Sequence, residues 1–344
     1  MTASSDAVSP SRRAPRRLGP FGVPPIGLGC MNLSHAYGVP PTPQEAELLL
    51  RTAVAEGVVL FDTAALYGFG ANEELVGRVL GAHRDAIVLA SKCGMTGVDG
   101  RRVIDGRPET IRRTADEALA RLRTDVIDLY YLHRLDRRVP VEESVGAMAE
   151  LVTAGKVRAL GLSEVSASTL RRAHAVHPIA ALQNEYSLWS RNPEQGTLQA
   201  TRELGVALVA FSPLARGFLT GAPPEPTELP AKDIRLGMPR FDAAHYPGNL
   251  ALRQQLAAVA ADHGCTLAQL ALAWVCAQGE HVVAIPGTRS VTHLRENLAT
   301  LDLAVPAEAL DAAGRILDAT TVHGARYNDT TLAEIDTERC GRAG

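Results

Sequence analysis

The sequence has few cysteines, and their spacing matches neither a metal site nor a disulfide framework. There are five, an odd number, and no two form a Cys-x-x-Cys pair: Cys30, Cys93, Cys265, Cys276 and Cys340. Zinc sites and disulfide-rich secreted domains need closely and regularly spaced cysteines. We therefore expect no metal, and we expect a protein of the reducing cytoplasm.

Long apolar runs and an excess of charge of one sign are also absent. The most apolar helix-like stretch, Leu267–Ala277, is interrupted by Gln269 and is too short to span a bilayer. The formal net charge is -3, which offers no attraction for nucleic acid or an anionic membrane. These features predict no nucleic acid and no membrane as partner, and they leave the oligomeric state open.

The N-terminal residues lack the apolar core of a signal peptide. Residues 1–17 contain four arginines among Ser, Pro and Ala, and no apolar run follows them. This composition predicts a disordered basic arm.

Lysine is scarce. Only three of the 35 basic residues are lysines, namely Lys92, Lys156 and Lys232. Arginine stays protonated in proteins, whereas the pKa of lysine can be tuned by its surroundings. A lysine retained in such an arginine-rich chain is therefore a candidate for a role that arginine cannot fill.

The 344 residues, 46% hydrophobic and 21% charged, have the balance of a soluble globular protein. Apolar runs alternate with amphipathic stretches, which predicts parallel strands covered by helices. The expected strands are Ile26–Gly29, Val58–Phe61, Ala86–Ala90, Val126–Leu132, Val157–Leu162, Ile179–Leu182, Val206–Phe211 and Val282–Ile285. The expected helices begin at Thr42-Pro43 and at Asn72, or cover Pro108–Leu122, Val141–Thr153, Ala167–Ala175, Pro193–Leu204, Leu250–His263 and Leu267–Ala277.

A doubly wound dinucleotide fold and a closed barrel both fit this alternation. The doubly wound fold carries G-x-G-x-x-G after an early strand, and Gly27–Asn32 and Gly68–Glu73 both fail at the last position. We therefore predict a single (β/α)8 TIM barrel over residues 18–320, with a C-terminal tail over 321–344. A short hairpin over Arg17–Pro25 should close its bottom. The Pro- and Gly-rich segment Gly221–Pro247 is a functional flap or partly disordered.

Most of the expected strands end in a polar residue, and in a barrel these ends converge on the face that carries active sites. The residues are Asp62, Lys92, His133, Ser163, Gln183 and Ser212. Tyr67 follows Asp62 closely in the chain. Each of these side chains alone would be read as a cap, a surface charge or a packing residue, but together they favour function.

Asp62, Tyr67, Lys92 and His133 form a group that could reduce a carbonyl. The oxygen needs a proton when the carbon receives hydride, and a phenol with a pKa of about 10 donates reluctantly. A nearby ammonium, Lys92, should lower the pKa of Tyr67. Asp62 can hold the ammonium, and His133 can hydrogen-bond the substrate oxygen.

Seven segments of the chain resemble those of the aldo-keto reductase superfamily, in its bacterial, yeast-type branch. The resemblance covers roughly residues 17–330 and is carried by Phe61–Gly68, Ser91–Lys92, Tyr130–Arg134, Gly161–Glu164, Gln183–Trp189, Phe211–Gly221 and Ile285–Arg289. It implies the same catalytic tetrad and an extended NADPH across the barrel top. Many relatives have Asn where this chain has Glu164, so Glu164 receives no assigned role.

The resemblance also assigns cofactor-binding residues. Ser163 and Gln183 match the residues that hold the carboxamide, and Phe211 matches an aromatic, usually Tyr, that stacks on the nicotinamide. The pyrophosphate loop is matched by Ser212, Leu214 and Gly217, and the adenosine end by Arg289, Glu296 and Asn297. The further expected contacts are Gly29, Met31, Asp62, Pro213, Arg216, Ile285, Gly287, Thr288 and His293. Met31, Phe69 and Trp189 are the expected walls of the substrate pocket.

The sequence thus predicts an NADPH-dependent oxidoreductase that acts on a small aldehyde or ketone, with Tyr67 as general acid. Two alternatives remain. The first is a dedicated keto-sugar or polyketide reductase of a secondary-metabolite pathway. The second is a non-catalytic NADP-binding subunit, similar to the β-subunits of potassium channels.

Overall fold

The computed structural model describes residues 13–98, 100–318 and 320–339. Its main sheet has eight strands, all parallel, in the order β12-β11-β10-β9-β8-β5-β4-β3. These strands are β3 (Leu28–Gly29), β4 (Leu60–Asp62), β5 (Val88–Cys93), β8 (Ile127–Leu132), β9 (Val157–Ser163), β10 (Ile179–Glu185), β11 (Ala207–Phe211) and β12 (Val282–Ile285). Parallel bridges Ile26–Ala284 and Gly29–Gly287 join the two ends of the sheet. The sheet therefore closes into the predicted TIM barrel.

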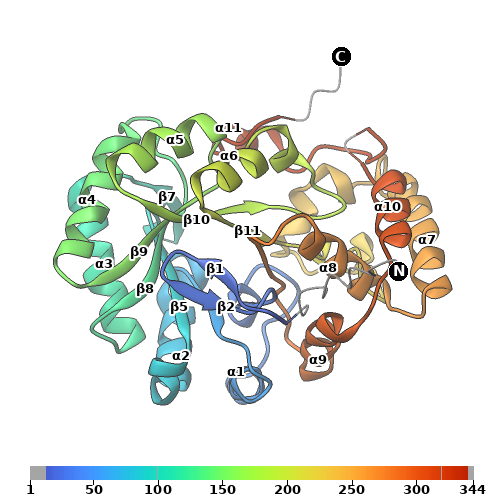
Figure 1. Cartoon of the computed structure of the whole chain (residues 1–344), viewed down its shortest axis with the longest axis horizontal. Helices are drawn as coiled ribbons and strands as arrows, with labels where there is room; N and C mark the ends of the chain where they lie inside the picture. The colour runs from blue at the N-terminus through green and yellow to red at the C-terminus, as the bar shows by residue number, and fades with distance from the viewer. Residues whose placement is uncertain (1–12, 99, 319, 340–344) are drawn as a thin grey trace, which may run out of the picture.

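Helices surround the strands, as Figure 1 shows. They are α1 (Pro43–Ala55), α2 (Ala71–Leu80), α3 (Pro108–Leu122), α4 (Val141–Thr153), α5 (Ala167–Val176), α6 (Thr197–Leu204), α7 (Tyr246–Asp262), α8 (Leu267–Ala277), α9 (Val291–Ala299), α10 (Ala307–Ile316) and α11 (Asp329–Ala333). Helix α1 begins as its sequence predicts, because Thr42 and Glu45 form a reciprocal capping box ahead of Pro43. Among the described helices, none is by itself long and apolar enough to cross a membrane, although α7 and α8, bent by 88° at the break, pass that test together.

Three helix boundaries differ from the predictions. Asn72 does not start α2, because Gly70 with φ 98° is the N-cap and the Asn72 amide is buried, donating to Cys30 O and Ser34 Oγ. The expected helix Pro193–Leu204 is broken at Gly196 into a 3-10 turn, η4 (Asn192–Gln195), and α6. Helix α7 begins four residues before the expected Leu250, at Tyr246.

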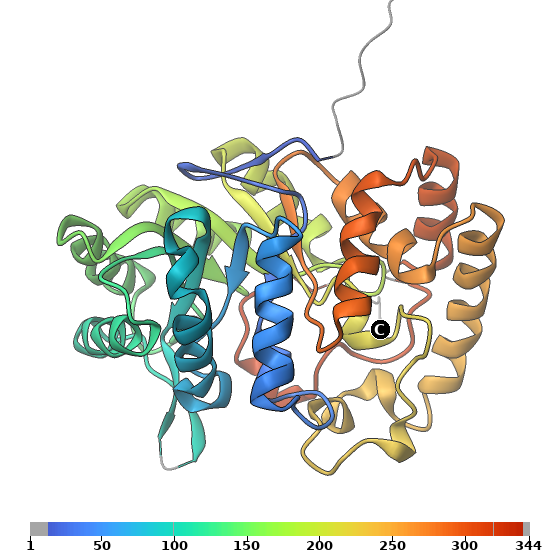
Figure 2. The same cartoon turned by 90° about the horizontal axis from the view of Figure 1, so that it is seen from below.

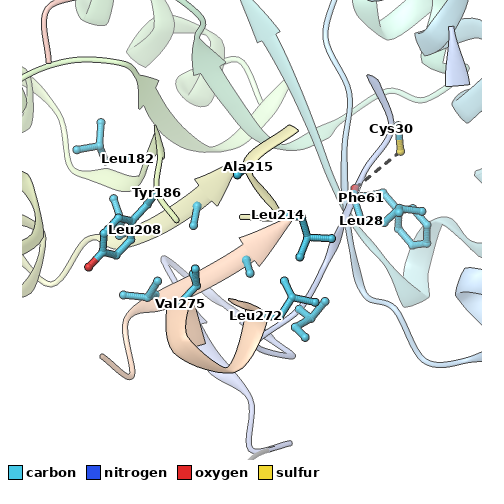
Figure 3. Close-up of a cluster of buried hydrophobic side chains, with 14 of the residues drawn as sticks. Leu28, Cys30, Phe61, Leu182, Tyr186, Leu208, Leu214, Ala215, Leu272 and Val275 are labelled. Atoms are coloured by element: carbon cyan, nitrogen blue, oxygen red, sulfur yellow. Dashed lines mark hydrogen bonds between the residues drawn. The ribbon is translucent and has the colours of Figure 1, made fainter. Parts of the chain in front are cut away.

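Apolar side chains form one layer inside the barrel and another between strands and helices. On β8, Leu129 and Tyr131 belong to the inner cluster, whereas Tyr130 and Leu132 belong to the outer one. A Cβ at Gly161 would lie 2.3 Å from the ring of Tyr131, so this glycine makes room for the phenol inside the barrel. Figure 3 shows part of the outer layer, where Leu272 of α8 faces the strands.

An N-terminal hairpin closes the bottom of the barrel, as predicted. Its strands β1 (Arg16–Leu18) and β2 (Phe21–Val23) pair antiparallel, and Leu18 and Val23 are buried in the inner cluster. Arg16 donates to Cys276 O at 2.6 Å. The arm expected to be disordered through Arg17 is therefore already folded at Arg16, and residues 1–12 lie outside the described residues.

Two segments project from the opposite end of the barrel (Figure 2). One is an antiparallel hairpin of β6 (Met95–Val98) and β7 (Arg101–Ile104), which the sequence did not predict. The other is residues 221–247, whose short 3-10 turns are η6 (Pro226–Glu228), η7 (Ile234–Gly237) and η8 (Pro239–Phe241). Both lie over the carboxyl ends of the strands.

Candidate active site

A cavity of about 1180 Å³ opens at the carboxyl ends of the barrel strands. The polar strand-end residues that line it are Asp62, His133, Ser163, Gln183 and Ser212. Lys92 is fully buried beneath Tyr67. The predicted convergence of distant residues on one face is thus what the barrel produces.

Lys92 is the centre of the tetrad. Its Nζ donates to Asp62 Oδ1, to Thr63 O at 2.8 Å and to Tyr67 OH at 3.2 Å. The other Asp62 oxygen accepts from Gln183 Nε2 at 2.7 Å. The rings of Tyr67 and His133 meet edge to face, with centroids 5.8 Å apart. All four residues therefore form one connected group.

The turn after β4 places Tyr67 at the cavity. Tyr67 opens a 3-10 segment, η2 (Tyr67–Gly70), in which Gly68 and Phe69 take left-handed φ values of 58° and 52°. This kink buries Tyr67 and turns the side chain of Phe69 outward, 57% exposed, at the cavity mouth.

Burial dominates the protonation of the tetrad. It raises the pKa of Tyr67, and the Lys92 ammonium offsets the rise only in part. Lys92 does lower this pKa, as expected, but burial has the larger effect and the net shift is upward. Burial alone would lower the pKa of Lys92, but the contacts with Asp62 and Tyr67 together outweigh burial, so this pKa is raised. Burial, Lys92 and Arg134 hold the pKa of His133 well below its usual range. At neutral pH the phenol thus keeps its proton and the imidazole is neutral.

The residues expected to hold the cofactor lie along the same cavity. They are Gly29, Met31, Asp62, Ser163, Gln183, Phe211, Ser212, Pro213, Leu214, Arg216, Gly217, Ile285, Gly287, Thr288, Arg289, His293, Glu296 and Asn297. Gly29 and Gly287 form a narrow floor, since a Cβ at either would lie 3.0 Å from another residue's oxygen. Ser290 caps α9 by accepting from His293 N, which leaves other N–H groups of that helix end available to an anion.

The segment after β11 is bent in a way that suits a phosphate loop. Ser212, Ala215 and Arg216 have φ values of 49°, 51° and 59°, a conformation that costs non-glycine residues free energy. The guanidinium of Arg216 donates to Tyr37 OH at 3.0 Å and Tyr327 OH at 2.7 Å, and pairs with Glu185. These buried contacts of the Arg216 side chain therefore stabilise the conformation of the loop.

Two of the three residues expected to form the substrate pocket lie at the cavity, and the third does not. Met31 and Phe69 line the cavity, and Trp189 does not. The Trp189 indole is 2% exposed and stacks on Phe218 with centroids 4.1 Å apart. The prediction for Trp189 was wrong because this aromatic cluster, which also contains Phe241, holds its ring.

Sequence reasoning missed a buried ionic network that ties the tail to the barrel. Glu164, fully buried with φ 56°, accepts from Arg326 at 3.1 and 2.7 Å. Glu185 contacts Arg326 as well as Arg216, and these two cations lower the pKa of Glu185 although burial alone would raise it. Tyr327 lines the cavity. The signal in the sequence was an acid at the end of each of two apolar strands, because a buried carboxylate requires a cation.

Residues 221–247 are bridged across the cavity to the loop after β3. Asp233 accepts from Gly38 N at 2.7 Å, and Ile234 N donates to Ala36 O at 3.0 Å. Arg235 donates to Arg216 O at 3.2 Å. The long segment is thus ordered and held over the site, which does not agree with the partly disordered alternative. Within the described ranges, no group of His, Cys, Asp or Glu could hold a metal ion.

Arg326→Ala is expected to destabilise the fold by about 3–5 kcal/mol, because Glu164 would stay buried without its partner. Chemical denaturation measures the loss. The double variant Glu164→Gln, Arg326→Ala removes both charges and should recover much of the stability. A single variant as stable as the wild type would show that the network contributes nothing.

Comparisons with known proteins agree with this geometry. The model of the aldo/keto reductase family matches residues 25–318. A probable aldo-keto reductase 1 of Glycine max is 41% identical over 310 residues, 89% of each chain. A glycerol dehydrogenase from Gluconobacter oxydans has a TM-score of 0.81 at 29% identity, covering 89% of this chain and 95% of its own. An aldo/keto reductase from Klebsiella pneumoniae, in complex with NADP and acetate, has a TM-score of 0.70 at 27% identity, covering 92% and 99%. The chain therefore belongs to the aldo/keto reductase family.

Proposed function

We propose that this enzyme reduces an aldehyde or ketone to the alcohol with NADPH, and that Tyr67 is the proton donor. The observation that carries the proposal is the contact of Tyr67 OH with Lys92 Nζ at 3.2 Å, at the wall of a cavity of about 1180 Å³. A structural ion pair of Lys92 and Asp62 would not need a phenol aimed into a cavity.

The residues that line the cavity support NADPH as the cofactor. Ser163 and Gln183 would hold the carboxamide, Phe211 would stack on the nicotinamide, and Ser212–Gly217 would hold the pyrophosphate. When bound, NADPH supplies the hydride. The complex of the Klebsiella pneumoniae relative with NADP supports the choice of cofactor.

The tetrad would then deliver the proton. Tyr67, kept protonated by burial, donates its hydroxyl proton to the substrate oxygen as that oxygen gains negative charge. Lys92, held by Asp62, stabilises the resulting phenolate. Neutral His133 has a buried Nδ1 without a partner among the described residues, and its ring can hydrogen-bond the substrate oxygen.

A carbonyl panel followed by NADPH absorbance tests the proposal and its alternatives. Aromatic aldehydes, dicarbonyls and keto-sugars represent the three classes. Broad turnover supports a general carbonyl reductase, and turnover of keto-sugars alone supports a dedicated pathway enzyme. Tight NADPH binding without turnover of any carbonyl would overturn the catalytic proposal in favour of a regulatory subunit.

The free cysteines Cys30, Cys93, Cys265 and Cys276 support a cytoplasmic location.

Arg289 should select NADPH over NADH. It is exposed at the cavity edge, where it donates to Val39 O and has donors left for the 2′-phosphate. Because a charge-assisted hydrogen bond contributes about 1.5–3 kcal/mol, Arg289→Ala should weaken NADPH about 10- to 150-fold and leave NADH nearly unchanged. Binding titrations with both cofactors measure this.

Arg295→Ala is the matched control, because Arg295 pairs with Glu56 and lies outside the cavity lining. Equal losses for both cofactors in Arg289→Ala would show that Arg289 does not bind the phosphate. A wild type that prefers NADH would overturn the choice of cofactor.

A further inference from the structure

The part of the cavity around Tyr67 carries an excess of positive charge. Arg102 and Arg134 line the cavity together with Tyr67 and His133. The Asp62 carboxylate is engaged by Lys92 and Gln183. Burial is the largest cause that lowers the pKa of His133, and the cations Lys92, Arg134 and Arg102 lower it further. Because Asp62 pairs with Lys92 and Glu334 pairs with Arg102, the excess comes mainly from Arg134, and a neutral substrate would leave it uncompensated.

Arg134 is the cation best placed to bind a ligand. It is partly buried, and its Nη1 donates to His133 O at 2.8 Å and Ser163 Oγ at 3.4 Å. These bonds fix the guanidinium beside two residues of the site. Its Nε and Nη2 have no hydrogen-bond partner, and no carboxylate pairs with it, within the part of the chain that the structure describes. The Nε–Nη2 edge of the Arg134 guanidinium is therefore available to bind a ligand.

Arg102 approaches from the β6–β7 hairpin. The hairpin packs on Phe69, because a Cβ at Gly97 would lie 2.0 Å from that ring, and Gly97 is the cross-strand partner of Arg102. Arg102 pairs through Nη2 with Glu334, next to α11. It is thus a second cation at the mouth, partly neutralised by the tail.

We propose that the carbonyl substrate carries a carboxylate, which Arg134 binds through its Nε and Nη2 edge, with Arg102 as the second cation. This inference rests on the proposed function. A carboxylate fits because its two oxygens match two parallel N–H donors of one guanidinium edge. Met31, Phe69 and Met95 line the same cavity and supply apolar contacts for the body of the substrate. The substrate class is therefore a semialdehyde or keto acid.

Matched substrates test the inference. The probes are 4-formylbenzoate and 3-formylbenzoate, each compared with its methyl ester, which keeps the aldehyde and removes the charge. For each protein the ratio of kcat/KM for the acid to kcat/KM for the ester is measured. Comparing this ratio between variants cancels the different intrinsic reactivities of acid and ester.

Arg134→Gln should lower the acid-to-ester ratio about 10- to 100-fold, the worth of a charge-assisted contact. Arg134→Lys, which keeps the charge and loses the fork, should fall between Arg134→Gln and the wild type. Arg102→Gln should lower the ratio by a smaller factor, because Glu334 already shares that cation. The loss should appear mainly in KM for the acid.

Arg138→Gln is the charge-matched control. Its side chain is 73% exposed, pairs with Asp136 and lies outside the cavity lining, so the ratio should stay at the wild-type value. An unchanged ratio in Arg134→Gln would overturn the carboxylate proposal while leaving the reductase proposal intact. Absence of turnover with acids and esters alike would instead overturn the reductase proposal.

Discussion

Tyr67→Phe should lower kcat for carbonyl reduction by about 10²–10⁴-fold, the usual contribution of a general acid. The change removes one hydroxyl and leaves the ring, so NADPH binding should persist. The hydroxyl is the group that contacts Lys92 and faces the cavity. Steady-state kinetics and a cofactor titration on the same preparation separate the two effects.

Tyr130→Phe provides the matched control. Tyr130 is fully buried in the outer apolar layer and does not line the cavity. This variant should keep wild-type kcat, since the hydroxyl it removes belongs to a residue outside the cavity lining. Near-normal turnover by Tyr67→Phe would remove Tyr67 from the role of proton donor.

Lys92→Arg should also lower kcat, by about 100-fold or more, although it preserves the charge. Lys92 is fully enclosed and makes three short contacts from a single nitrogen. A guanidinium is larger and forked, so it would displace the phenol, and misplacement by about 1 Å can cost about 100-fold. Steady-state assays of product formation measure the loss of kcat, and circular dichroism checks that the fold is intact.

Two further variants test why kcat falls in Lys92→Arg. Lys156→Arg changes a surface lysine that pairs with Asp116 and should have no effect. Lys92→Met removes the charge but keeps an unbranched chain, so comparison with Lys92→Arg separates charge from position. A fully active Lys92→Arg would show that this lysine was not retained for its chemistry.

The fold could be predicted wherever local chemistry and burial agree. Helix α1 begins at Pro43 because a capping box precedes it, and Gly57 and Gly205 follow helices with φ values of 85° and 67°, as C-terminal glycines do. The β6–β7 hairpin was missed because most of its residues are exposed, which leaves no apolar pattern to read. Asn72 was misread because its amide bonds across the fold rather than capping its own helix.

Some features of the candidate site could likewise be predicted from the sequence, and others could not. The grouping of Asp62, Tyr67, Lys92 and His133 could be predicted because each lies at or shortly after the carboxyl end of a strand, and parallel strands in a barrel end on one face. The role of Glu164 could not, because it depends on Arg326, which is 162 residues away in the chain. Trp189 failed for a related reason: an aromatic residue near a strand end can turn into a cluster whose members are distant in sequence. The net pKa of Tyr67 required the depth of its burial, which no pattern contains.

The placement of the three lysines decides how the protein can be attached to a surface. Lys92 is enclosed and cannot react with an amine-directed reagent while the barrel is closed. Lys156 lies just before β9, at the end that carries the N-terminal hairpin. Lys232 is exposed on the segment over the cavity. Coupling through Lys156 therefore leaves the cavity facing solution, whereas coupling through Lys232 tethers the segment that covers it. With Lys232→Arg, Lys156 is the one reactive side-chain amine that remains, so coupling through side chains leaves the cavity facing solution.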